Sequence, residues 1–241
     1  KFIAVIHQSN VLGTINPVKD IVRMAHDVGA LTLVDGAQWV PHGRTDIQDI
    51  DCDFYAFSGH KMLGPTGIGI LYGKPELLEK MQPFQGGGEM IRSVTMERAT
   101  WNDIPYKFEA GTPNIAQAIG LGAAVKYIQG IGLDVIQNHG RDLTKYAMKQ
   151  LTQMDVIKIH GNQQDRGPVI SFEVTGVHPH DLAQFLDQDG IAIRAGQLCA
   201  QPIMDKLGVF ATNRASFYIY NNEQDIDTFC ESIEKTAQIF A

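Results

Sequence analysis

The sequence predicts an α/β fold, with a mainly parallel sheet in residues 1–130 and a smaller α+β domain in residues 131–241. The first observation is an apolar, strand-like run at 2–6, followed by an amphipathic helix and a second apolar run at 31–35. The second is a change near 130–132, after which short strands and helices mix. Strands that alternate with helices pair in parallel through right-handed crossovers.

Residues typical of helix caps and turns mark the ends of the helices and strands predicted in the first half of the chain. Asn16 and Pro17 are typical of an N-cap and a first helical position, and Gly29 is typical of a helix stop. Two further strands are expected to end at Asp35 and Ser58, where apolar runs close. The remaining expectations are a strand at 67–73, a short helix from Pro75, a loop at 82–105 and a helix at 114–127.

The second half has shorter elements. A helix over 133–151 carries Ile136, Leu143 and Ala147 on one face. After it we expect strands at 156–159, 169–174, 191–194 and 215–220, a helix at 179–188 and a final helix.

Composition narrows the classes of function. The 241 residues carry a formal net charge of −7 and no Lys/Arg run, so no nucleic-acid partner is expected. No apolar run approaches the ~20 residues of a membrane span, and no signal peptide is evident, so we expect no membrane partner and a cytoplasmic location. The chain starts inside an apolar run without a methionine, and we expect it to be part of a longer protein.

The three cysteines have different surroundings. Their odd number and the lack of a CxxC pair disfavour both a disulfide framework and a structural zinc site. Cys230 lies in an apolar helical stripe, and Cys52 lies between two aspartates whose charge opposes thiolate formation. Cys199, in R-A-G-Q-L-C-A-Q-P, is therefore the candidate reactive thiol.

Polar segments follow the three expected strands of the first half. They are residues 7–10, 35–38 and 58–61. Ligands of parallel sheets bind beyond the carboxyl ends of the strands, so we expect these segments to converge on one crevice.

Two of these residues suggest a pyridoxal phosphate (PLP) site. Lys61, in S-G-H-K, has an amine that forms a Schiff base if its surroundings lower its pKa; the alternative is a solvated lysine in a polar turn. Asp35, in V-D-G-A-Q, has a carboxylate that keeps a pyridinium nitrogen protonated; the alternative is a helix N-cap.

Five ordered motifs resemble one family. They are S-N-V-L-G-T, L-V-D-G-A-Q, F-S-G-H-K-M-L-G-P-T-G-I-G-I-L-Y, F-E-A-G-T-P-N and R-A-G-Q-L-C-A-Q-P. Together they resemble the C-terminal two-thirds of a group II (SufS-type) cysteine desulfurase, a PLP enzyme of the class V aminotransferases. The resemblance implies fold type I, the aspartate aminotransferase-like fold. Residues 1–130 would then be the C-terminal portion of the large PLP-binding domain, and residues 131–241 the small domain with the nucleophile loop.

The resemblance also implies the residues that bind PLP. Lys61 would bind the cofactor aldehyde and then act as the base that removes the substrate Cα proton. Asp35 would pair with the ring nitrogen, and Gln38 would hydrogen-bond the phenolic oxygen. The phosphate would be bound by Ser58, by His60 and, from the other subunit of a homodimer, by Thr112.

The substrate side of the site follows from the same resemblance. Arg214 would bind the carboxylate of L-cysteine, and Asn10 would lie near the substrate or the ring oxygen. Cys199 would attack the substrate sulfur and carry it as a persulfide, with release of L-alanine. A sulfur-acceptor protein of the SufU or SufE type would take the sulfur for iron–sulfur cluster assembly.

Three other residues have more than one interpretation. Arg194 is a cation that could favour the thiolate, hold the loop or bind substrate; the alternative is a structural salt bridge. His178 and His180 make a weak metal pair, and exposure at a helix start is expected, with no metal. Many relatives carry two histidines where this chain has Gln197-Leu198, so any role of those histidines does not transfer.

The resemblance implies a preceding N-terminal segment with a phosphate-binding loop and a residue that stacks on the PLP ring. Without it, the chain alone is expected to bind PLP weakly and to turn over little. Two alternatives stay open. One is a selenocysteine lyase, which need not depend on Cys199. The other is a non-catalytic binding or dimerisation fragment.

Overall fold

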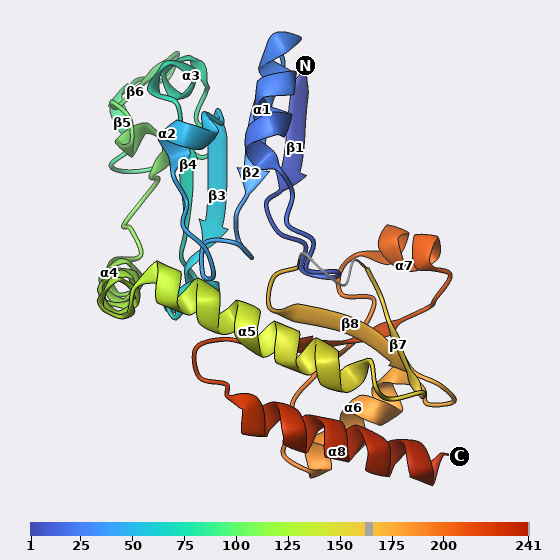
Figure 1. Ribbon diagram of the computed structural model, residues 1–241. Helices are drawn as coiled ribbons and strands as arrows, with labels where there is room; N and C mark the ends of the chain where they lie inside the picture. Colours follow the sequence, from blue (N-terminus) through green and yellow to red (C-terminus); the bar gives the residue numbers. More distant parts are fainter. Residues whose placement is uncertain (162–165, 241) are drawn as a thin grey trace. The chain divides into compact units, whose positions relative to one another are not determined.

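The computed structural model describes residues 1–161 and 166–240 (Figure 1). It divides into two compact units. Unit 1 contains residues 1–7, 17–41 and 45–130. Unit 2 contains residues 8–16 and 42–44 and the chain from Ile131 onward.

Unit 1 is built on a four-stranded sheet. Its strands lie in the order β1 (Phe2–Ile6), β2 (Leu31–Asp35), β3 (Phe54–Ser58) and β4 (Gly69–Gly73). The first three are parallel, as predicted, whereas β4 runs antiparallel to β3. Helices α1 (Val18–Asp27) and α2 (Ile47–Ile50) contribute to a core made of Val18, Val22, Val34, Ile50, Cys52 and Tyr55.

Helix α1 begins one residue later than its sequence signals suggest. Pro17 is the N-cap, because its ψ of 68° is not helical, and the prediction of Asn16 as N-cap was wrong. At the other end, Gly29 adopts a φ of +66°, which confirms the predicted glycine stop.

The segment 82–105, predicted as a loop, contains a hairpin instead. Its strands are β5 (Ile91–Val94) and β6 (Ala99–Trp101), which pair antiparallel with a register shift near Ser93. Strands this short leave too few residues for a recognisable alternation of apolar and polar side chains. The hairpin follows α3 (Pro75–Lys80) and precedes a 3-10 turn, η2 (Tyr106–Phe108), and α4 (Ile115–Ile131).

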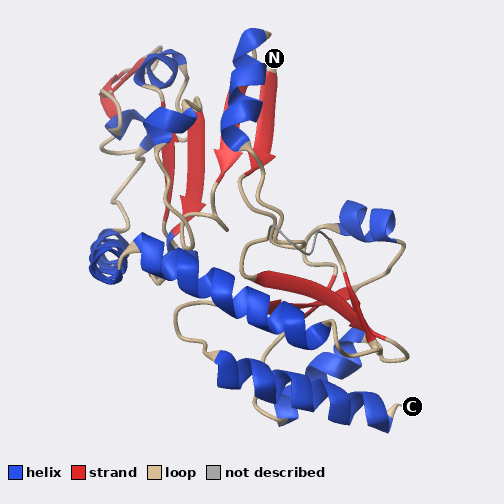
Figure 2. Ribbon diagram, in the orientation of Figure 1, coloured by secondary structure: helices blue, strands red, loops and turns tan. Residues whose placement is uncertain are grey.

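Unit 2 has an antiparallel sheet covered on one face by helices (Figure 2). The strand order is β7 (Ile157–Ile159), β8 (Val169–Val174), β10 (Thr212–Ser216) and β9 (Arg194–Gly196). The helices α5 (Leu133–Leu151), α6 (Pro179–Gln188) and α8 (Glu223–Ile239) pack apolar residues of their inner faces against Ile170, Phe172 and Ala215. No single helix in the described part of the chain is both long and apolar enough to cross a membrane.

The elements around Cys199 differ most from the prediction. The strand expected at 191–194 spans 194–196 (β9), and the strand expected at 215–220 spans 212–216 (β10), so each overlaps its predicted range by only one or two residues. The apolar residues Ile191 and Ile193 pack on the core without belonging to the strand. Helix α7 (Gln201–Leu207), which follows Cys199 directly, was not predicted.

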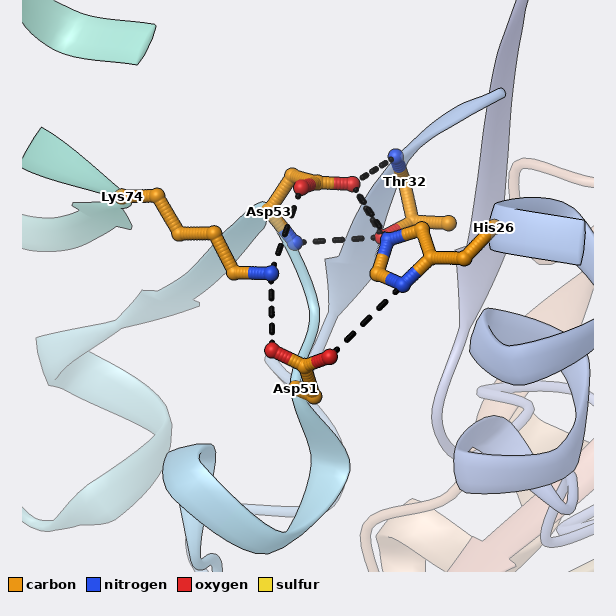
Figure 3. Close-up of polar contacts among 5 residues, drawn as sticks. All are labelled: His26, Thr32, Asp51, Asp53 and Lys74. Atoms are coloured by element: carbon orange, nitrogen blue, oxygen red, sulfur yellow. Dashed lines mark hydrogen bonds and ion pairs between the residues drawn. The ribbon is translucent and has the colours of Figure 1, made fainter. Parts of the chain in front are cut away.

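A buried ionic network joins β2 to the start of β3 (Figure 3). One carboxylate oxygen of Asp53 accepts hydrogen bonds from Thr32 N (2.7 Å), Thr32 Oγ1 (3.0 Å) and the His26 ring (2.9 Å). Lys74 Nζ lies 3.5 Å from the other oxygen and 2.7 Å from Asp51. Desolvation opposes ionisation of Asp53, but these hydrogen bonds and the Lys74 charge outweigh it and lower its pKa. The network therefore holds β2 and β3 together at their amino ends.

Candidate functional site

Asp35 ends strand β2 with an exposed carboxylate. Its Oδ1 accepts a hydrogen bond from Ala37 N at 2.9 Å, which closes a turn. Val40 N donates to Gly36 O at 2.9 Å in this turn, and the next helix is α2, so Asp35 caps a turn and not a helix. Within residues 1–161 and 166–240, no cation pairs with Asp35, and its carboxylate remains available to a ligand.

Lys61 lies in a tight 3-10 turn, η1 (Gly59–Met62), directly after β3. Gly59 N donates to Ile68 O at 2.9 Å, and Gly64 N donates to Gly59 O at 3.0 Å. A Cβ on Gly64 would come within 2.7 Å of Gly59 O, so the turn requires glycine there. Lys61 is half-buried, and no carboxylate among the described residues pairs with it.

The sheet brings the other PLP candidates of unit 1 to the same edge. Asp35 pairs with Ala56 in the parallel β2–β3 register, which places Ser58 two residues beyond that level. Ser58 and Gln38 are half-buried, and His60 is exposed. Thr112 is exposed in the segment between η2 and α4.

The buried residue His7 is hydrogen-bonded to Asp35 at the start of this turn. His7 N donates to Asp35 O at 2.8 Å, and the His7 ring lies 2.8 Å from the Tyr55 hydroxyl and stacks on Trp39 at 4.4 Å. Burial lowers the pKa of His7 to about 4, so the ring is neutral at neutral pH. A Cβ on Gly36 would lie 2.1 Å from the Tyr55 ring, so only glycine fits above it.

Sequence reasoning found His7 only as part of a polar segment and missed Trp39 and Tyr55. An isolated tyrosine in an apolar strand is usually read as core, and nothing in the local pattern indicates its partner. The expected convergence of strand ends holds for His7, which contacts the Asp35 turn. Residues 8–10 belong to unit 2.

In unit 2, Arg194 and Arg214 lie directly opposite each other on β9 and β10. The Arg214 guanidinium donates from Nε to Ser216 Oγ (3.1 Å) and from Nη1 to the Asn10 carbonyl (2.9 Å). No carboxylate in the described ranges pairs with either arginine, so the salt-bridge alternative for Arg194 has no partner there. Both line a pocket of about 660 Å³.

The electrostatics of this pair favour an anion. Desolvation lowers the pKa of Arg214 and the charge of Arg194 lowers it further, while Cys199 acts in the opposite direction. Cys199 therefore lies near the Arg214 guanidinium. A carboxylate bound between the guanidinium groups would relieve their repulsion.

Cys199 is exposed in the loop between β9 and α7, whereas the other two thiols are shielded. Burial, together with the charges of Asp53 and Asp51, raises the pKa of Cys52 to about 11. Burial likewise raises the pKa of Cys230 to about 11, and it packs against the core of unit 2. The predicted contrast among the three cysteines is thus confirmed in their exposure.

His178 and His180 are exposed at the start of α6, as expected. His178 is the N-cap, and its ring nitrogen accepts a hydrogen bond from His180 N at 3.3 Å. In the part of the chain that the structure describes, no three His, Cys, Asp or Glu side chains gather to hold a metal ion.

Comparison with known proteins gives the family. The sequence model of the protein family described as aminotransferase class V matches residues 1–229. A probable cysteine desulfurase of Halalkalibacterium halodurans is 54% identical over 240 residues, and a cysteine desulfurase of Haloferax volcanii is 53% identical over 242 residues. Each alignment covers 100% of this chain but only 59% and 57%, respectively, of the relative, so the chain spans less than two-thirds of their length.

Solved structures agree with this assignment. The cysteine desulfurase CsdA from Escherichia coli superposes with a TM-score of 0.96 at 39% identity, over 100% of this chain and 60% of that one. The apo cysteine desulfurase from Thermococcus onnurineus NA1 gives 0.95 at 40% identity, over 99% of this chain and 60% of that one. The chain therefore belongs to the aminotransferase class V family, and its fold is that of the fold type I, PLP-dependent cysteine desulfurases.

Proposed function

We propose that the protein containing this chain is a cysteine desulfurase that converts L-cysteine to L-alanine and carries the sulfur as a persulfide on Cys199. The observation that carries the proposal is the cross-strand pair of Arg194 and Arg214, which binds no carboxylate of the described residues and lies near the exposed Cys199 thiol. An amino-acid carboxylate fits two guanidinium groups, and a nearby cysteine suits sulfur transfer. The names of the relatives support the same reaction.

The donor set of unit 1 fits PLP. Lys61 offers an amine to the aldehyde, and Asp35 offers the pyridinium nitrogen a carboxylate that pairs with no cation of the described residues. Ser58 and His60 offer donors to the phosphate, and Gln38 offers its amide to the phenolic oxygen. Bound PLP would supply an electron sink that eases removal of the substrate Cα proton.

The chain's own residues then have distinct tasks. Arg214 retains N–H groups beyond its bonds to Asn10 and Ser216, and these bind the substrate carboxylate. The Lys61 amine would act as the base that takes the substrate Cα proton.

Transfer of sulfur from L-cysteine to Cys199 needs no oxidant or reductant besides these two. The Cys199 thiolate attacks the substrate sulfur, an S–S bond forms and the substrate C–S bond breaks. The electron pair of that bond stays with the substrate carbon, which is protonated to give alanine. The products are the Cys199 persulfide and L-alanine.

The proposal extends to the type of enzyme, its oligomeric state, its location and its sulfur acceptor. We infer a SufS-type enzyme that works as a cytoplasmic homodimer, with Thr112 reaching the cofactor phosphate of the second subunit. A sulfur-acceptor protein of the SufU or SufE type would take the persulfide sulfur for iron–sulfur cluster assembly. The exposure of both Thr112 and Cys199 supports these contacts.

The experiment measures alanine release from L-cysteine and the mass of Cys199 peptides in the protein that contains this chain. A mass increase of one sulfur on Cys199 is expected, together with a visible PLP absorbance band that Lys61→Ala removes. Cys199→Ala should abolish alanine release, whereas the matched control Cys230→Ala should retain it. Retained activity in Cys199→Ala would contradict the persulfide mechanism and favour a lyase that does not need this thiol.

A further inference from the structure

Leu198 and Cys199 are neighbours with opposite surroundings. Leu198 is 6% exposed and packs with Val11 and Met204 in a small apolar cluster, whereas Cys199 is exposed. Consecutive side chains are thus divided between the interior and the solvent. The buried one anchors the loop that presents the other.

The backbone of this pair is unusual. Leu198 has a φ of 55° and Cys199 a φ of 57°, so two consecutive residues other than glycine adopt the left-handed conformation. Such a conformation persists only where surrounding contacts hold it. Ala200 N donates to Gln197 O at 2.9 Å and closes the turn around the two residues.

A hydrogen bond from Asn10 also stabilises this turn. Its side-chain amide donates to the Leu198 carbonyl at 2.9 Å, across 188 positions of sequence. The Asn10 carbonyl accepts the hydrogen bond from Arg214 Nη1 at 2.9 Å. One residue therefore connects the guanidinium proposed to bind substrate with the loop that carries the thiol.

We propose that Leu198 is a positioning residue for Cys199, with its side chain anchored in the apolar cluster and its carbonyl held by Asn10. The inference rests on the proposed function for the role of Cys199 as nucleophile. A polar side chain at position 198 would carry polar atoms into a cluster built of aliphatic side chains and methionine.

The test compares four variants of the complete protein by amide hydrogen exchange of residues 197–203, a readout that does not require turnover. Leu198→Ala removes the anchor and Asn10→Ala removes the carbonyl hold. Leu198→Met keeps an apolar side chain at this position, and the flexible methionine can stay buried at positive φ. Leu207→Ala removes apolar contact from the same cluster at a position eight residues from Cys199.

Exchange at Ala200 should be at least about tenfold faster in Leu198→Ala and Asn10→Ala than in the wild type. It should stay near the wild-type rate in Leu198→Met and Leu207→Ala. With L-cysteine as substrate, Leu198→Ala should lower kcat about tenfold and leave KM unchanged, because the residues proposed to bind substrate and PLP are intact.

Three results would overturn the inference. The first is unchanged loop exchange in Leu198→Ala. The second is equal acceleration in Leu207→Ala, which would indicate a loss of general stability. The third is an Asn10→Ala variant that raises KM without altering loop exchange, which would assign Asn10 to the substrate alone. A wild-type protein that released no alanine would instead contradict the proposed function, and exchange would still decide whether Leu198 and Asn10 hold the loop.

Discussion

Arg194 and Arg214 face each other directly across the antiparallel strands β9 and β10, so two guanidinium charges lie on the same face of the sheet. Like charges directly opposite destabilise a strand pair by roughly 0.2–1 kcal/mol. No carboxylate in the described parts of the chain compensates them. The fold thus maintains an unfavourable pair, which is a reasonable cost where a ligand carboxylate is to be bound.

Replacing Arg194 by Gln should separate stability from binding. The free energy of unfolding without substrate should rise slightly, by up to about 1 kcal/mol, because the repulsion is removed. KM for L-cysteine should rise at least about tenfold, since a carboxylate contact is lost. Urea unfolding and steady-state kinetics on the same samples measure both quantities. A loss of stability would contradict the like-charge interpretation.

The three thiols should differ in reactivity in the native protein. Iodoacetamide at pH 7.5 should modify Cys199 first, because it is exposed, whereas the pKa values of Cys52 and Cys230 are raised to about 11 by burial. Peptide mass spectrometry after timed labelling gives the order. In Cys199→Ala, rapid labelling should disappear and return only in urea, where all thiols become accessible. Early labelling of Cys52 would show that the core of unit 1 opens readily.

His7, which is buried, and His42, which is half-buried, should make the protein acid-sensitive. Burial lowers the pKa values of His7 and His42 to about 4, against about 6.5 when unfolded. Between these values the unfolded chain binds protons that the folded chain does not, so stability falls as pH drops from about 6.5 to about 4. The loss should be at most about 3 kcal/mol per histidine.

The variant His42→Phe isolates one of these contributions. His42 meets Tyr218 edge-on, with ring centroids 4.8 Å apart, and phenylalanine keeps an aromatic ring in that place. The free energy of unfolding of the variant, measured in urea from pH 7.5 to pH 4.5, should decline less steeply than that of the wild type. Parallel pH profiles would mean that His42 is already protonated in the folded state.

The network around Asp53 should be important for stability because it joins β2 to β3. Asp53→Asn should cost roughly 2–4 kcal/mol, because a buried acceptor of three hydrogen bonds loses its charge. Lys74→Met should cost less, since His26 and Thr32 still bind the carboxylate. Thermal and urea unfolding measure both. As a matched control, Asp49→Asn alters an exposed ion pair with Lys19 and should leave the free energy of unfolding nearly unchanged.

Much of the fold follows from local pattern. The apolar periodicity and end signals predict the bounds of α5 and α6, and the glycine stop of α1 is confirmed. Parallel pairing of β1, β2 and β3 follows from their connections through helices. The hairpin of β5 and β6 does not, because three or four residues carry too little periodicity.

The sequence by itself determined which residue types stand at the strand ends and in the loop: Lys61 after β3, Asp35 as the last residue of β2, and Cys199 as the thiol with no apolar stripe around it. The tertiary structure decided the relationships among distant residues. It set the register that places Arg194 opposite Arg214, the stacking of His7 on Trp39, and the bond from Asn10 to the Leu198 carbonyl. These depend on strand register and on packing between segments as far as 188 residues apart, and no local sequence pattern encodes such distances.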